Sequence, residues 1–160
     1  MNHLFVAAIA LIAAVYPGTQ PDRQPQTVDS VLDALHTAAA EADQDTYFAL
    51  FTDDAVFLGT DATERWTIDQ FREFAMPYFQ RESAWTYKPV ERHIMFDDPD
   101  NPRTAWFDEL LENDAYGLCR GTGVLRRIDD RWRIAHYSLS FTIPNESAAD
   151  VVRAVRAHQD

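Results

Sequence analysis

The sequence predicts one α+β domain in which helices come first along the chain and an antiparallel sheet follows. From residue 28 to 39, and again from 68 to 78, apolar side chains recur every three or four residues, the spacing of one helix face. From residue 84 to 143, four long segments are rich in aromatic and β-branched residues and are separated by turn-forming residues. This order predicts helices packed on one face of the sheet.

The size, composition and charge of the chain limit the kinds of protein and partner that we expect. With 160 residues it can bury one substantial core, and its 46% hydrophobic content is that of a globular protein. Its formal net charge of -12 should repel phosphate backbones and anionic lipid headgroups, so we expect no nucleic-acid partner and no membrane surface. No phosphate loop, dinucleotide fingerprint or zinc spacing occurs, and we therefore expect no cofactor and no metal site.

An uncharged apolar run covers residues 4–15 and is followed by Tyr16-Pro17-Gly18. Its length is typical of a secretory signal and is too short for a membrane span. We expect an exported protein. The alternative is a cytosolic protein with an apolar arm, because only the terminal amine and His3 supply positive charge at the start.

The domain boundaries follow from composition. We expect a signal peptide over 1–18, a proline-containing linker over 19–26, a folded domain over 27–145 and a C-terminal helix or tail over 146–160. The lone Cys119 excludes a disulfide within the chain.

The helices are predicted from apolar spacing and from one capping signal. Val28, Val31, Leu32, Leu35 and Ala39 form a stripe that predicts a helix to about residue 42, and a second, shorter helix should follow residue 45. Residues 55–58 then form a short strand that Gly59 closes. Thr67 followed by Gln70 matches a capping box and predicts a third helix that ends near residues 77–80.

The second half is predicted to be an antiparallel meander. Its strands cover about 84–96, 103–112, 115–127 and 131–143, and a last helix should follow residue 145. A strongly curved sheet would wrap around the helices as a cone whose mouth can hold a small molecule.

Strand pairing decides which side chains face the interior. A two-residue turn at Asn113-Asp114 would place Asp108 opposite Cys119 and Trp106 opposite Gly121. Trp106 and Asp108 share one face of their strand, because side chains two residues apart point to the same side. We expect this face to be the inner one.

In the last strand one face is more apolar than the other, and we expect it to point toward the helices; it consists of Ala135, Tyr137, Leu139, Phe141 and Ile143. This apolar face lies on the same side of the sheet as Asp108 only if the loop at residues 129–131 has an odd length. A two-residue turn would place it on the opposite side.

Six segments in order carry a family resemblance. They are Tyr47-Phe48-Ala49-Leu50-Phe51, Asp54-Ala55-Val56-Phe57-Leu58-Gly59-Thr60-Asp61, Glu64-Arg65-Trp66, Ala105-Trp106-Phe107-Asp108-Glu109, Gly121-Thr122-Gly123 and Trp132-Arg133-Ile134-Ala135-His136. With them the chain resembles, over residues 27–145, a SnoaL-like domain of the nuclear transport factor 2-like superfamily, the cone fold shared with ketosteroid isomerase and scytalone dehydratase. The resemblance implies a homodimer through the outer face of the sheet. It specifies fold more than activity, because the superfamily includes isomerases, dehydratases, hydrolases and assembly domains.

The candidate site residues follow from these expectations. Asp108, desolvated beside Trp106, is the candidate catalytic base, and in similar domains the locations of His93 and Tyr47 point into the cone, where they would complete a polar cluster. An apolar ligand site would be walled by Trp66, Trp85, Trp106 and Tyr137. The alternatives are a carboxylate that only satisfies the core, an exposed histidine, and aromatic side chains that fill the cone.

Two functions remain open. The first is binding of a small, largely apolar molecule in the cone, with cofactor-free proton transfer of the isomerase or dehydratase type and Asp108 as base. The second is a non-catalytic dimerisation or ligand-sensing module.

Overall fold

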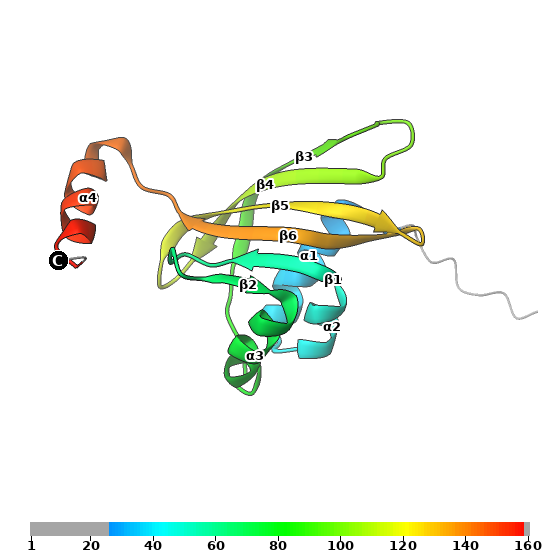
Figure 1. Ribbon diagram of the computed structural model, residues 1–160, viewed down its shortest axis with the longest axis horizontal. Helices are drawn as coiled ribbons and strands as arrows, with labels where there is room; N and C mark the ends of the chain where they lie inside the picture. Colours follow the sequence, from blue (N-terminus) through cyan, green and yellow to red (C-terminus); the bar gives the residue numbers. More distant parts are fainter. Residues whose placement is uncertain (1–25, 159–160) are drawn as a thin grey trace, which may run out of the picture.

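A computed structural model describes residues 26–158 (Figure 1). The expected signal peptide at 1–18 and the linker up to residue 25 lie outside the described residues. Within the described part, no helix is long and apolar enough to cross a membrane. The elements are α1 (Val28–Ala40), α2 (Gln44–Ala49), β1 (Phe51–Leu58), β2 (Arg65–Thr67), α3 (Ile68–Phe79), β3 (Lys88–Phe96), β4 (Thr104–Asn113), β5 (Gly117–Ile128), β6 (Arg131–Phe141), a 3-10 turn (Asn145–Ser147) and α4 (Ala148–Arg156).

The six strands form one curved sheet with the order β2-β1-β6-β5-β4-β3. Neighbouring strands are antiparallel except β1 and β6, which are parallel. Along the chain, these two strands are separated by α3 and the other four strands. Helices α1, α2 and α3 lie together on one face of the sheet (Figure 1). The predicted α+β class, with a curved sheet around N-terminal helices, is confirmed.

Helices α1 and α3 begin where the sequence predicted, whereas α2 begins at Gln44, ahead of its expected start after residue 45. Thr27 caps α1 in a box with Ser30, and Thr67 caps α3 in the predicted box with Gln70. Each box satisfies backbone groups that a helix start otherwise leaves unpaired. The apolar stripe of α1 is buried, and the buried aromatic residues of α2 and α3 belong to the same core as Phe51 and Phe57 of β1. By contrast, α4 buries no residue and lies beyond the end of β6, away from the body (Figure 1).

The turn between β4 and β5 is one residue longer than predicted. Asn113 pairs with Gly117, and the Asn113 side chain accepts hydrogen bonds from the backbone N–H groups of Ala115 and Tyr116. Gly117 has a φ of 70°, a left-handed conformation that glycine adopts without strain. The expected register is therefore wrong, and every partner in β5 moves by three residues.

The new register places Glu109 opposite Gly121 and Phe107 opposite Gly123. Asp108 pairs with Thr122 instead of Cys119, and Trp106 pairs with Val124 instead of Gly121. Residues 105, 107, 109 and 111 are the buried positions of β4, so the expectation that Trp106 and Asp108 face the interior is wrong. The physical reason is steric: the glycines leave room for the ring of Phe107 and the long side chain of Glu109.

The last strand reaches its orientation through a bulge within the strand. Asp129 and Asp130 form a two-residue turn with positive φ, so the odd-length loop was wrong. Val124 pairs with His136, but Leu125 pairs with Ile134, which leaves Ala135 as an extra residue. Trp132 and Ile134 are consequently buried before the bulge, contrary to expectation, whereas Tyr137 is buried after it, as expected.

Candidate functional site

A cavity of about 500 Å³ opens between the helices and the inner face of the sheet. Most of its lining is aromatic or aliphatic. Five of the lining rings form near-parallel stacks: Tyr137 with Phe57 (5.3 Å between ring centroids), Phe57 with Phe71 (3.8 Å) and Trp66 with Phe74 (4.7 Å). A hollow of this size and lining is typical of a small-molecule site.

Glu109 anchors a polar cluster behind this lining. Glu109 is on the inner face of β4, and it is 1% exposed. Oε1 lies 2.8 Å from His36 Nε2 and accepts a hydrogen bond from the Tyr137 hydroxyl at 3.4 Å. Oε2 accepts a hydrogen bond from Arg92 Nε at 2.9 Å and lies 2.8 Å from Arg92 Nη2. One buried carboxylate thus connects α1, β3 and β6.

Arg92 compensates the buried negative charge. Besides Glu109, its Nη1 lies 2.8 Å from Asp33 Oδ1 and 3.2 Å from Asp29 Oδ1, both on α1. Desolvation lowers the pKa of Arg92, but the hydrogen bond to Asp33 and the charge of Glu109 outweigh it, and the net shift is upward. Three protein carboxylates therefore surround this cation, although its buried Nη2 makes no hydrogen bond in the described part of the chain.

His36 presents one ring nitrogen to the cluster and leaves the other free. Both oxygens of an ionised carboxylate can only accept; Arg92 occupies Oε2, and His36 Nε2 therefore carries the proton and donates to Oε1. Nδ1 makes no hydrogen bond among residues 26–158, and the His36 side chain lines the cavity. In this tautomer Nδ1 is thus an unpaired acceptor on a residue of the cavity wall.

Two tyrosines bring hydroxyl groups to the same cavity. Burial, followed by the charge of Glu109, raises the pKa of Tyr137 well above its usual value. Burial also raises the pKa of Tyr47, whose hydroxyl has no hydrogen-bond partner in the described part of the chain. Both hydroxyls are therefore neutral near pH 7, and Tyr47 is free to donate.

Gly121 makes the approach of Tyr137 to Glu109 possible. A Cβ atom at this position would lie 2.6 Å from the Tyr137 hydroxyl oxygen and 3.1 Å from Glu109 Oε1. No side chain fits there without displacing the cluster.

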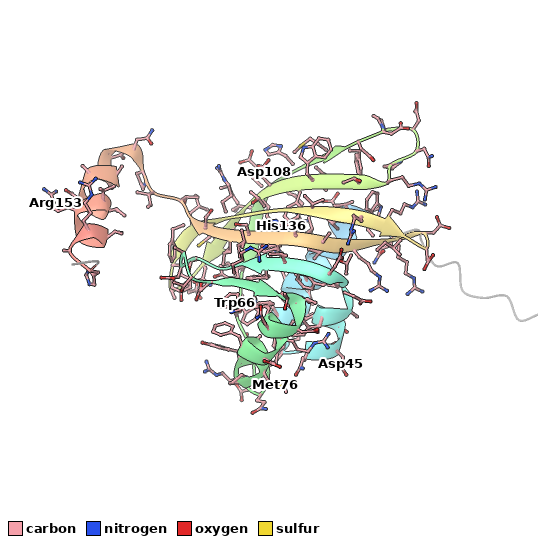
Figure 2. All side chains as sticks on the ribbon, in the orientation of Figure 1. Asp45, Trp66, Met76, Asp108, His136 and Arg153 are labelled. Atoms are coloured by element: carbon pink, nitrogen blue, oxygen red, sulfur yellow. The ribbon has the colours of Figure 1, made fainter. Side chains whose placement is uncertain are left out.

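The structure divides the predicted site residues between the two faces of the sheet. Tyr47, Trp66 and Tyr137 line the cavity. Trp106, Asp108 and His93 lie on the outer face: Trp106 is 42% exposed, and His93 pairs with Glu91 of its own strand at 2.8 Å. Figure 2 shows Trp66 on the helix side of the sheet and Asp108 on the opposite side. The expected cluster of Asp108, His93 and Tyr47 does not form.

Three residues of the cluster were missed: His36, Arg92 and Glu109. His36 follows Leu35 on an otherwise apolar helix face, and its partner lies 73 residues away, so no local pattern connects them. One signal was available: Gly121 and Gly123 share the spacing of Phe107 and Glu109. In the described residues, no three His, Cys, Asp or Glu side chains gather as a metal site.

The curved sheet, the helices inside it and the cavity at its centre define a cone-shaped domain of the nuclear transport factor 2-like superfamily. The chain belongs to the family of the SnoaL-like domain, whose model matches residues 28–144. No curated protein matches the chain.

Solved structures resemble the chain in fold. A nuclear transport factor 2-like protein of unknown function from Pseudomonas putida KT2440 has a TM-score of 0.61 at 13% identity, covering 75% of this chain and 87% of that one. A ketosteroid isomerase-like protein from Erwinia carotovora atroseptica has a TM-score of 0.55 at 20% identity, covering 77% and 99%. At these identities the likeness shows the shared fold alone.

Proposed function

We propose that the cone binds a small, largely apolar molecule and that His36 transfers a proton on it without a cofactor. The observation that carries this proposal is the free Nδ1 atom of His36 beside an aromatic cavity, with Nε2 held by the buried Glu109. A histidine oriented through one nitrogen by a carboxylate is a common arrangement for a general base.

The chemistry that fits these groups is an isomerisation or a dehydration. Nδ1 takes a proton from the carbon beside a carbonyl group, and Tyr47 is available to donate a hydrogen bond to an oxygen that gains negative charge. The imidazolium, stabilised by Glu109, then returns the proton to another carbon or to a departing hydroxyl group. The proton is conserved and no electrons are exchanged, so the reaction needs no redox partner.

The test uses two simple probes because the natural ligand is unidentified. Binding is followed through the fluorescence of 2-naphthol. Proton abstraction is followed by NMR as exchange of the α-protons of 2-tetralone, an apolar bicyclic ketone, in heavy water. We expect wild-type protein to bind the first and to accelerate exchange of the second. His36→Gln should lower the exchange rate by about 100-fold or more and keep most of the 2-naphthol affinity.

His93→Gln is the matched control, since His93 lies on the outer face. It should change neither measurement. Exchange at the same rate in wild type and His36→Gln, with 2-naphthol still bound, would contradict the proton transfer and favour the alternative, a non-catalytic ligand-sensing module. Failure to bind 2-naphthol would contradict the ligand site itself.

We also infer that the outer face of the sheet joins two copies of the chain. Trp106 and Leu118 on this face are 42% and 44% exposed. Val124 and Met95 are the cross-strand neighbours of Trp106. Exposed apolar area on a two-sided sheet favours association. Trp106→Glu should convert a dimer to a monomer in sedimentation velocity, whereas a wild-type monomer at all concentrations would refute the inference.

A further inference from the structure

Charge is unevenly distributed around the cavity. Behind His36, the cation of Arg92 is shared among Glu109, Asp29 and Asp33, and Glu109 adds negative charge. A ligand carboxylate placed beside His36 would meet the negative charge of Glu109, whose compensating cation already faces three carboxylates. This part of the cavity therefore accepts the neutral end of a ligand.

Arg81 supplies positive charge at the exposed mouth of the cavity. It follows α3, where its backbone N–H donates to the carbonyl of Tyr78, and its exposed side chain lines the cavity. The guanidinium lies 4.6 Å from the centroid of the Tyr78 ring, which also lines the cavity. Within residues 26–158, Arg81 has no acidic partner within ion-pair distance.

The one carboxylate among the lining residues does not neutralise Arg81. Glu64 packs over Gly59 in the turn between β1 and β2, and its Oε2 accepts the backbone N–H of Asp61. The formal net charge of the chain is -12, so its surface as a whole is acidic. An anion that reaches the mouth is thus attracted by Arg81 and repelled by most of the surrounding surface.

We propose that Arg81 is a specificity-determining residue that selects ligands with a carboxylate at the mouth end, so that the site takes an aromatic or polycyclic acid whose neutral end reaches His36. The near-parallel stacks of Phe57, Phe71 and Tyr137 suit a flat ring system. The planar fork of a guanidinium suits a carboxylate better than it suits a neutral polar group. This inference rests on the proposed ligand site.

The experiment compares two ligands of nearly equal size, 6-hydroxy-2-naphthoate and its methyl ester, by fluorescence titration. Wild-type protein should bind the acid about fivefold more tightly than Arg81→Gln does at low ionic strength. The affinity for the neutral ester should stay within about twofold, and the difference for the acid should shrink at about 0.5 M salt.

Arg72→Gln is the matched control. Arg72 lies on α3 and its guanidinium is 4.9 Å from the Phe48 ring, yet it does not line the cavity. It should leave both affinities unchanged. An equal loss for the acid in both variants, or an equal loss for acid and ester in Arg81→Gln, overturns the role of Arg81 while the ligand site stands. Absence of binding by both probes overturns the site and this inference together.

Discussion

Asp108 and Glu109 are consecutive carboxylates in β4 that lie on opposite faces of one sheet. Glu109 is 1% exposed and is surrounded by His36, Arg92 and Tyr137. Asp108 is partly exposed on the outer face, and its side chain makes no hydrogen bond or ion pair with another described residue. The same functional group therefore has two different environments one residue apart.

The difference shows how a buried charge shapes a site. Removing a carboxylate from water costs several kcal/mol unless a cation and hydrogen bonds replace the lost hydration. For Glu109 these come from α1, β3 and β6, so the groups that stabilise the carboxylate also fix His36 at the cavity wall. Asp108 stays hydrated and needs no partner, and it organises nothing around it.

The largest expected effect comes from removing the inner carboxylate. Glu109→Ala leaves the buried guanidinium of Arg92 with less compensation, and we expect a loss of about 3–5 kcal/mol in the free energy of unfolding. Asp108→Ala should change it by less than about 0.5 kcal/mol. Urea denaturation measures both, and equal losses in the two variants would remove the distinction between the faces.

A steric change at Gly121 should have the next largest effect. Gly121→Ala places a methyl group 2.6 Å from the Tyr137 hydroxyl oxygen, and we expect a loss of about 1–3 kcal/mol. Adding Tyr137→Phe removes the clashing atom and should recover part of this loss. If the double variant is less stable by the full sum of the two single losses, the contact between these residues does not exist as described.

The smallest effect is a pH dependence that the inner face should show. The pKa of Tyr137 is raised in the folded protein by burial and by Glu109, so above about pH 10 the unfolded chain releases this proton and the folded chain does not. The stabilising contribution is complete below that pH and is lost as the pH rises.

Unfolding measured between about pH 8 and pH 11 checks the sign of this effect. Tyr137→Phe should reduce the fall in stability by about 1 kcal/mol per pH unit above about pH 10. Part of the fall should remain in this variant, because burial also raises the pKa of Tyr47. An unchanged slope in the variant would show that Tyr137 ionises in the folded protein as it does in water.

The helices of this fold can be predicted from local sequence, but the choice of which face of β4 is buried cannot. The capping box at Thr67 and the apolar stripe of α1 are determined by residues within one or two turns of helix, and both were predicted correctly. In β4, Trp106 with Asp108 and Phe107 with Glu109 form equivalent patterns of one aromatic and one acidic residue. Alternation alone cannot choose between them.

The choice depends on distant residues and on turn geometry. A turn of three residues, 114–116, instead of the predicted pair Asn113-Asp114, brings Gly121 and Gly123 opposite the large side chains of the inner face. The bulge at Ala135 likewise reverses the alternation within β6, so Ile134 and Tyr137 both face inward. Single-residue changes of this kind leave the composition unchanged, and they decide which side chains share a cavity.

The most direct test of a ligand site on the inner face is NMR titration of the histidine imidazoles with 2-naphthol. His36 lines the cavity, whereas His93 and His136 belong to the outer face and serve as internal references. We predict that the ring resonances of His36 shift with saturation and that those of His93 and His136 do not. Saturable shifts at His93 or His136, with His36 unmoved, would contradict the account and place the ligand on the opposite face of the sheet.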